Sequence, residues 1–564
     1  MSPLPDTAAP AIDAAVTTAR AASRRWLELP ITAKADHLAT IRGRFAAVSD
    51  DMIAETLAAK GLDARHAGED WASGPMSVIR TIRFLEDSLR GIASSGRVPL
   101  PDSAIRERPD GQVVVDVMPG DAWDRILYRG WSAGVWMDPS VGRGEARDHM
   151  GGIHTKPEMA RPGVVAVLGA GNVASITPLD IVHQMFVEGR TVVAKCHPIN
   201  EYIGPHLEHA FERLVDEGFL RFVYGGPAVG AALIEHPDVD GVHLTGSERT
   251  FDAIVWGAGE EATHRRETGQ PRVSKPITAE LGNVSPVIVV PGNWSTGSIR
   301  WQAEHVATQV LLNAGHNCNA TEVLILPAEW PQRDEFMEAV ADAIGSQPPR
   351  VAYYPGSDDR FDRIAGSGTK VRMFGERRLG MVPPAIIEGV DPESNAPAFR
   401  EEAFCHVLSV TDLEGADPAS YLERAVAFCN ERLRGTLNAT ILIDPGTAKS
   451  IGPALDRAVS DLRYGTVAVN VWAAAGFPIG VTPWGAYPGH TLQDIQSGIG
   501  FVHNARLIDR PQKAVITAPF RLVPAPPWSV FHRRGGPALR ETTMFEARPG
   551  PLALAKVLRY AVRP

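Results

Sequence analysis

The chain has 564 residues, of which 44% are hydrophobic and 22% charged, and its net charge is −10. This length exceeds what one hydrophobic core usually supports, so two or three domains are expected. No apolar run approaches the length of a membrane span, and the first twenty residues lack the apolar region of a signal peptide. We therefore expect a cytoplasmic protein, with no nucleic-acid partner.

Four cysteines, Cys196, Cys318, Cys405 and Cys429, are too few for a disulfide framework in a chain of this size. They form neither a CxxC pair nor the spacing of zinc ligands. Free thiols are therefore expected, one of them reactive, and no metal site is predicted.

The first part of the chain is predicted to be helical and then to form a β-ribbon. Residues 8–97 are rich in alanine and carry apolar residues at helical spacing. Between residues 113 and 144 the pattern becomes β-like and includes three tryptophans. A ribbon projecting between helical segments would be a natural contact between subunits.

Strands and helices alternate from Gly163 onward. GVVAVLG at 163–169, TVVAK at 191–195 and GVHLT at 241–245 are predicted strands with helices between them. Such alternation predicts a mostly parallel, doubly wound sheet that binds ligands at the carboxyl ends of its strands. Glycines such as Gly225 and Gly246 fall at these ends, where a pyrophosphate can approach the backbone. Because no complete GxGxxG is present, this pattern alone leaves nucleotide binding and a generic sheet equally open.

A second α/β unit, beginning near Lys275, contains the reactive-thiol candidate. Cys318 lies in the segment LLNAGHNCNATEVLILP, in a loop between a predicted helix and a predicted strand at 322–326. Small and amide-bearing neighbours favour an approachable thiol over a packed one. Glu280 lies in ITAELGNVSP, where we expect a turn that opens this unit, and an isolated glutamate there is equally typical of a solvated turn.

Six segments occurring in order resemble the aldehyde dehydrogenase superfamily, from about Ala8 to His503. They are the strand–helix–strand segment at 161–195, HPDVDGVHLTGS, AELGNVSP, HNCNAT, EEAFCHVLSV and YGTVAVN. The resemblance implies an α/β fold of two doubly wound parallel-sheet domains plus a β-ribbon for oligomerisation. The implied divisions are a dinucleotide-binding domain at 1–112 and 151–279, the ribbon at 113–150, a catalytic domain at 280–480, a return segment at 481–504 and a C-terminal extension at 505–564.

The resemblance also implies roles for individual residues. Cys318 would be the nucleophile that passes through a thiohemiacetal and a thioester, and Glu280 the base that activates the hydrolytic water. Asn172 would bind the oxyanion together with the backbone N–H of Cys318. The residues implied in cofactor binding are Lys195, Gly225, Gly246, Ser247, Leu281, Glu402 and Phe404. Ordinary structural roles remain open for them, such as a helix cap for Ser247 and a core aromatic for Phe404.

Departures from the family pattern bear on the cofactor and the product. Pro198 stands where many NAD-preferring members have an acid, so the cofactor is NAD or NADP. His316 replaces a common glutamine near Cys318 and is expected to be a hydrogen-bonding loop residue. The sequence KCHP is similar to coenzyme-A-acylating relatives, whereas Glu280 favours a free carboxylic acid. Transfer to coenzyme A and a catalytically silent binding role stay as alternatives, and a homodimer or homotetramer is expected.

The segment from Ala505 to Pro564, called the C-terminal segment below, has a composition of its own. It carries eleven basic and three acidic residues, a net charge of +8 against −18 for the rest, and nine prolines. Its last helical stretch is amphipathic and basic, so it could lie on an anionic membrane surface or pack on the protein itself or on a partner subunit. Its aromatic residues are predicted to roof the substrate entrance and suit a bulky or long-chain aldehyde: Phe520, Trp528, Phe531 and Phe545.

Overall fold

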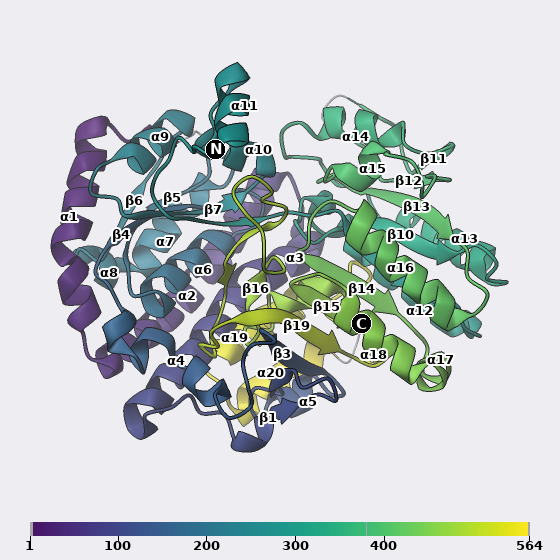
Figure 1. Cartoon of the computed structure of the whole chain (residues 1–564), viewed down its shortest axis with the longest axis horizontal. Coiled ribbons are helices and arrows are strands. Elements are labelled where there is room, and N and C mark those ends of the chain that lie inside the picture. The colour runs from purple at the N-terminus through teal and green to yellow at the C-terminus, as the bar shows by residue number, and fades with distance from the viewer. Residues whose placement is uncertain (1–3, 379–380, 562–564) are drawn as a thin grey trace.

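The computed structural model describes residues 4–378 and 381–561. Two large sheets lie side by side and are covered by helices, the smaller of them at the left of Figure 1 and the larger at the right. A third sheet consists of two short strands, β16 (Trp484–Gly485) and β18 (Phe501–Val502). This arrangement confirms the predicted α/β class with parallel sheets. Within the described residues, no helix is long and apolar enough to cross a membrane.

The smaller sheet has six strands in the order β17-β8-β7-β4-β5-β6. Its strands are β4 (Val164–Leu168), β5 (Thr191–Lys195), β6 (Leu220–Val223), β7 (Gly241–Gly246), β8 (Ile277–Leu281) and β17 (Gly498–Ile499). All are parallel except β17, which pairs antiparallel with β8. Every residue of β4 and β5 is buried, as continuous apolar runs predict for strands covered on both faces.

Helices connect these strands and cover both faces of the sheet. They are α6 (Ile176–Val182) with the π-helical turn η7 (His183–Val187), α7 (Gly204–Ala210), α8 (Glu212–Asp216), α9 (Pro227–Glu235), α10 (Glu248–Val255) and α11 (Gly259–Thr268). The predicted N-terminal helices are α1 (Ala9–Glu28), α2 (Ile31–Lys60), α3 (Ala67–Trp71) and α4 (Ser77–Ser95). The alternation predicted from Gly163 onward is therefore confirmed.

The larger sheet has eleven strands in the order β1-β2-β3-β19-β15-β14-β9-β10-β13-β12-β11. Its strands are β1 (Ile105–Glu107), β2 (Val113–Met118), β3 (Ser132–Met137), β9 (Ser285–Val289), β10 (Thr321–Pro327), β11 (Lys370–Met373), β12 (Ala385–Glu388), β13 (Val407–Leu413), β14 (Asn438–Leu442), β15 (Thr466–Val469) and β19 (Pro511–Thr517). The chief helices beside it are α12 (Thr296–Leu311), α13 (Arg333–Gly345), α14 (Ser357–Ala365), α16 (Pro418–Arg432) and α18 (Gly452–Asp461). The predicted ribbon, β1 to β3, thus extends this sheet through β19.

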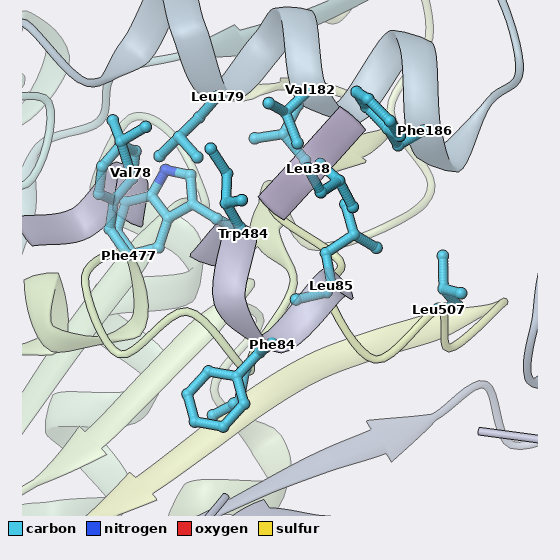
Figure 2. Close-up of a cluster of buried hydrophobic side chains, with 14 of the residues drawn as sticks. Leu38, Val78, Phe84, Leu85, Leu179, Val182, Phe186, Phe477, Trp484 and Leu507 are labelled. Atoms are coloured by element: carbon cyan, nitrogen blue, oxygen red, sulfur yellow. The ribbon is translucent and has the colours of Figure 1, made fainter. Parts of the chain in front are cut away.

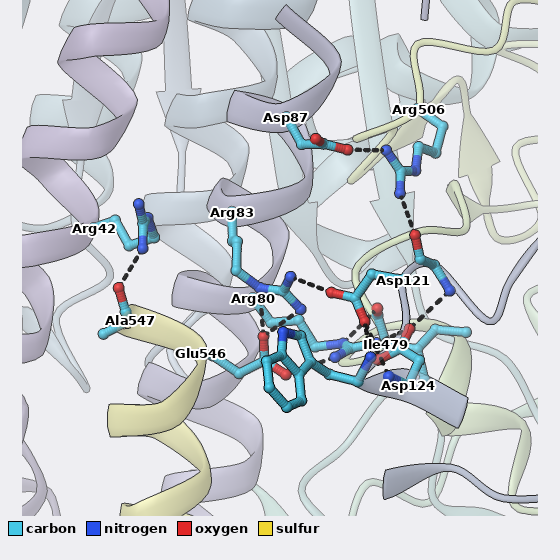
Figure 3. Close-up of polar contacts among 12 residues, drawn as sticks. Arg42, Arg80, Arg83, Asp87, Asp121, Asp124, Ile479, Arg506, Glu546 and Ala547 are labelled. Atoms are coloured by element: carbon cyan, nitrogen blue, oxygen red, sulfur yellow. Dashed lines mark hydrogen bonds and ion pairs between the residues drawn. The ribbon is translucent and has the colours of Figure 1, made fainter. Parts of the chain in front are cut away.

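The C-terminal segment is part of the folded body. Strand β19 pairs with β15 on one side and β3 on the other, and α19 (Gly535–Ala547) packs against α3 and α4. Figure 3 shows the end of α19 beside two arginines of α4: buried Glu546 accepts hydrogen bonds from Arg80 at 2.6 Å and Arg83 at 2.7 Å. The final helix α20 (Pro551–Ala561) packs on α19 and buries Val557. The separate composition therefore does not make a structurally separate piece.

A hydrophobic cluster joins the helices beside the smaller sheet to the chain that returns from the larger one. Figure 2 shows the residues of α2, α4 and α6 packed with Phe477, Trp484 and Leu507. The indole of Trp484 is fully buried in this cluster. This packing fixes Trp484 relative to both sheets.

Candidate active site

Cys318 lies in a strained loop between α12 and β10. Asn313 and Ala314 each have φ of 55°, and Gly315 follows with φ of 74°. A Cβ on Gly315 would come within 2.4 Å of the backbone of Cys405, so this position requires glycine. Two consecutive non-glycine residues in the left-handed region are unusual and require strong support from their surroundings. Cys318 is partly exposed, whereas the other three cysteines are buried.

The support for this loop converges on Asn313. Its backbone N–H donates to Glu69 at 2.7 Å, and its side-chain oxygen accepts from Lys60 at 2.7 Å and from Tyr353 at 3.1 Å. Its side-chain amide donates to the backbone carbonyls of Asn172 and His316, each at 3.0 Å. Asn313 therefore links the cysteine loop both to the helices that precede it in the chain and to the loop after β4.

Ion pairs beneath the loop hold these partners in place. The Lys60 ammonium lies 2.5 Å from Asp70, and the Arg350 guanidinium lies 2.5 Å from Glu69. All four side chains are almost completely buried. Removing one member would leave a buried charge without its partner, so the pairs fix the loop geometry more than they add net stability.

Asn172 follows β4 and faces the cysteine loop. Its side-chain amide donates to the His316 carbonyl at 3.0 Å, which uses one of its two N–H groups. Asn172, Ile176 and Cys318 line two different cavities, one of about 1070 Å³ and one of about 100 Å³. The thiol therefore lies where two cavities of different size meet.

The larger cavity opens at the carboxyl ends of β4, β5, β7 and β8 and extends towards the second sheet. Of the residues predicted to bind a cofactor, those lining it are Lys195, Gly246, Ser247, Leu281, Glu402 and Phe404. Gly225 is not part of this lining; its φ is 127°, and a Cβ added there would meet the side chains of Asp6 and Val229. Gly225 lies in the turn before α9, and its role as a cofactor contact stays a prediction.

Lys195 and Ser247 occupy the ends of β5 and β7. The Lys195 side chain is buried, and burial lowers the pKa of its ammonium. The Ser247 hydroxyl accepts from the backbone N–H of Thr250 at 3.2 Å and thereby caps α10, the structural role left open for it. Both residues line the larger cavity, which lies at the carboxyl ends of the strands, where open α/β sheets bind their ligands.

Glu280 lies inside β8, paired with Thr245 of β7, and not in the turn that we expected. Its register in the parallel sheet, which the short apolar pattern could not reveal, points its carboxylate into the larger cavity. Trp484 donates its indole N–H to this carboxylate at 3.0 Å. The pKa of Glu280 is raised to about 8: burial is the main cause, the Trp484 bond opposes the rise, and the nearby charge of Asp180 adds a smaller contribution to it. Near neutrality a large share of Glu280 is protonated.

The surroundings of Cys318 favour the neutral thiol. Burial, and then the charges of Glu280 and Glu402, hold the pKa of Cys318 well above its ordinary value. The thiol needs an acceptor for its proton before it can attack a carbonyl. Histidine is a poor candidate: burial lowers the pKa of His316 to about 3, and its Nδ1–H donates to the carbonyl of Phe404 at 2.7 Å. His316 thus adopts the geometry of the hydrogen-bonding loop residue expected from the sequence.

Glu402 and Phe404 face the larger cavity from the loop before β13. Glu402 lies so close to Gly282 that a Cβ there would be 1.9 Å from its Oε1. That Oε1 is buried and has no hydrogen-bond partner among the described residues. Burial and the charge of Glu322 raise the pKa of Glu402 well above its ordinary value. An unpartnered acceptor facing a cavity is suited to a ligand hydroxyl.

Several residues of the site were not predicted from the sequence. Tyr353 donates to the backbone carbonyl of Asn172 at 3.0 Å, and Tyr354 packs between His316 and Phe404. Trp484 lies 204 residues from its partner Glu280. Such contacts are set by packing between distant segments, so no local pattern identifies them.

The smaller cavity has a different character from the larger. Its lining is mostly apolar and aromatic, including Tyr128, Trp131, Trp472, Phe477 and Trp528. Four aromatic residues of the C-terminal segment were predicted to roof the substrate entrance. Of these four, Trp528 lines this cavity.

Comparisons with known proteins agree on one family. A profile of the aldehyde dehydrogenase family matches residues 147–349. The chain is 28% identical over 345 residues to alpha-ketoglutaric semialdehyde dehydrogenase 2 of Azospirillum brasilense, covering 57% of this chain and 59% of that protein. It is 32% identical over 165 residues to the N-succinylglutamate 5-semialdehyde dehydrogenase of Sphingopyxis alaskensis, covering 29% and 31%. The matched parts of these curated relatives are thus less than two thirds of their length.

The fold matches over nearly the whole chain. The NADP-dependent glyceraldehyde-3-phosphate dehydrogenase of Bacillus halodurans C-125, solved with NADP, aligns with a TM-score of 0.60 at 16% identity, covering 91% of this chain and 92% of that one. Residues 147–349 thus match the aldehyde dehydrogenase family, and the chain as a whole shares its fold with solved aldehyde dehydrogenases.

Proposed function

We propose that this protein oxidises an aldehyde to a carboxylic acid, with NAD or NADP as the hydride acceptor. The observation that carries this proposal is the position of Cys318 at the junction of two cavities, one large and partly polar, the other small and mostly apolar. The match of residues 147–349 to the aldehyde dehydrogenase family, and the similarity to curated aldehyde dehydrogenases, support the reaction class.

The larger cavity fits a nicotinamide dinucleotide. Its volume of about 1070 Å³ is at the upper end of ligand sites, and strand-end glycines leave the backbone accessible to phosphates. We assign Lys195 and Ser247 to the adenosine and pyrophosphate end, and Glu402 and Phe404 to the nicotinamide end. The unpartnered Oε1 of Glu402 would accept a hydrogen bond from a ribose hydroxyl. Pro198 brings no carboxylate to repel a 2′-phosphate, so both cofactors stay in the proposal.

The chemistry begins when the Cys318 thiol gives up its proton to solvent and its sulfur adds to the aldehyde carbonyl, which forms the oxyanion of a thiohemiacetal. The second N–H of the Asn172 side chain and the backbone N–H of Cys318 stabilise the oxyanion. A bound nicotinamide supplies the hydride acceptor. Loss of hydride from the former aldehyde carbon leaves a thioester on Cys318. Glu280, as carboxylate, then takes a proton from the attacking water, and the acid leaves as the thiol is restored.

The test is turnover of a panel of aldehydes with NAD and with NADP, in the presence and absence of coenzyme A. We expect reduced nicotinamide and free acid from the wild type, and none above background from Cys318→Ala. An acyl-coenzyme A product would instead support the acylating alternative. Absence of reduced nicotinamide with every aldehyde, or unchanged activity in Cys318→Ala, would overturn the proposal.

Assembly and location stay predictions. The homodimer or homotetramer and the cytoplasmic location were expected from the sequence, and a membrane contact through the C-terminal segment was one of the alternatives kept open for it. Sedimentation would test the first, and vesicle flotation the last.

A further inference from the structure

We propose that the aldehyde is apolar and compact, without a second charged group, and that Trp131 and Trp528 determine this specificity. The inference rests on the proposed function, because it assigns the smaller cavity to the part of the substrate that Cys318 does not attack. It goes beyond that function by naming the substrate class and the wall that selects it.

The smaller cavity offers no counter-charge to an anionic group. Every residue that lines the smaller cavity belongs to the described part of the chain, and none of them is lysine, arginine or histidine. The single charged residue is Glu69, whose carboxylate is already paired with Arg350 at 2.5 Å and with the Asn313 N–H at 2.7 Å. A carboxylate or phosphate on the far end of a substrate would meet no counter-charge, and burying an unpaired charge is strongly unfavourable.

Tyr128, Trp131 and Trp528 form an aromatic wall on one part of the smaller cavity. Trp131 packs edge-on against Tyr128, with ring centroids 5.5 Å apart, and against Trp528, with centroids 5.8 Å apart. Near-perpendicular rings at this spacing are a favourable arrangement and hold each other in position. Near the thiol, Trp472 donates its indole N–H to the Asn319 carbonyl at 2.8 Å, so this ring too has a fixed orientation.

The position of Trp528 depends on the C-terminal segment being anchored to the body. Trp528 packs against the cluster of Ile53, Trp71, Ala72, Met76 and Leu539, the last of which belongs to α19. Helix α19 is fixed in turn by the ion pairs of Glu546 with Arg80 and Arg83 (Figure 3). Arg80 also donates to the carbonyl of Ile479 at 2.8 Å, and Ile479 lines the same cavity. One buried network therefore supports two parts of the wall.

The volume of the smaller cavity limits the size of the substrate. The cavity measures about 100 Å³, somewhat less than the ~150 Å³ apolar cavity known to bind benzene. A single ring or a short branched chain is of this scale. A long unbranched chain would have to extend past Trp528.

The first experiment compares benzaldehyde with 4-carboxybenzaldehyde, which share the ring and differ in the distal charge, and uses acetaldehyde as a reference too small to reach the wall. We expect kcat/KM of the wild type to be at least about 100-fold higher for benzaldehyde. Values within threefold of each other, or a preference for the carboxylated ring, would overturn the inference. Because acetaldehyde reports the chemical steps alone, its turnover would show that the proposed function stands even if the inference fails. Absence of turnover with all three aldehydes would overturn the inference, and absence with the whole aldehyde panel would also refute the proposed function.

The second experiment changes the wall. Trp528→Ala should lower kcat/KM for benzaldehyde at least tenfold and leave acetaldehyde within threefold, and Trp528→Phe should recover most of the loss. Leu552→Ala is the matched control, since Leu552 is in the same C-terminal segment and is 84% exposed. Ala475→Arg adds a cation to the lining and should raise the relative kcat/KM for 4-carboxybenzaldehyde at least tenfold. Equal losses for both aldehydes in Trp528→Ala, with a folded protein, would contradict a role in specificity.

Discussion

Replacing Trp484 with phenylalanine should slow steady-state turnover near neutral pH by making Glu280 harder to ionise. The indole N–H stabilises the charged form of the carboxylate through a bond of 3.0 Å, so its loss raises the pKa of Glu280 further. A buried hydrogen bond to a charged group contributes about 1.5–3 kcal/mol, and about 1.4 kcal/mol corresponds to one pH unit. The midpoint of the turnover-versus-pH curve should therefore move upward by about one to two units.

The size of the effect follows from the starting point. With the pKa of Glu280 raised to about 8, roughly a tenth of the wild-type protein has the base ionised at pH 7. A further rise of one to two units would lower turnover at pH 7 by about 10- to 100-fold and restore it at high pH. The pre-steady-state burst of reduced nicotinamide should be nearly unchanged, because hydride transfer precedes the step that needs Glu280.

The assay is kcat measured across pH together with the burst amplitude in rapid mixing. Trp256→Phe is the matched control, because Trp256 is also buried but its indole N–H has no partner among the described residues. The control should keep the wild-type pH profile. If Trp484→Phe gave a profile superimposable on the wild type, the assignment of Glu280 as a base tuned by this bond would be refuted.

Three further outcomes follow from the same geometry. Glu280→Gln should give a burst of reduced nicotinamide followed by slow turnover with no rise towards alkaline pH, and an unaltered steady state in stopped-flow and steady-state assays would remove Glu280 from its role. Asn313→Ala should lower the burst rate constant at least tenfold without changing the apparent affinity for the cofactor, because it releases the cysteine loop from Asn172; an unchanged burst would argue against this positioning role. Glu546→Ala should lower the free energy of unfolding in chemical denaturation by about 3–5 kcal/mol, since two buried guanidinium groups lose their partner. Asp50→Asn breaks the exposed pair between Asp50 and Arg540 and should lower the free energy of unfolding by less than about 1 kcal/mol. Equal losses of stability in Asp50→Asn and Glu546→Ala would contradict the stabilising role of the buried pairs of Glu546.

The local features of the site were accessible from the sequence. Apolar runs identified β4, β5 and β10, and the small and amide-bearing neighbours of Cys318 identified a loop with room beside the sulfur. These predictions succeed because strand and loop propensities depend on residues close together in the chain. The same locality explains the error at Glu280: a short apolar segment followed by glycine is compatible with a turn or with a strand, and only its pairing with β7 decides between them.

The C-terminal segment shows the limit of composition as a guide. Its prolines and basic residues suggested a separate piece, yet β19 lies between β3 and β15, and α19 is mostly buried. The pairing of Arg80 with Glu546 joins residues 466 positions apart. A charge count cannot reveal which charges are buried together.

The sequence by itself determined the order of strands and helices, the resemblance to a family and the identity of the reactive thiol candidate, because each is written in neighbouring residues. Only the tertiary structure decided that Glu280 is buried against Trp484, that Asn313 joins the cysteine loop to Lys60 and Asn172, and that Trp528 walls a cavity without positive charge. Burial and electrostatics depend on atoms brought together from distant parts of the chain, so they appear only once the chain has folded.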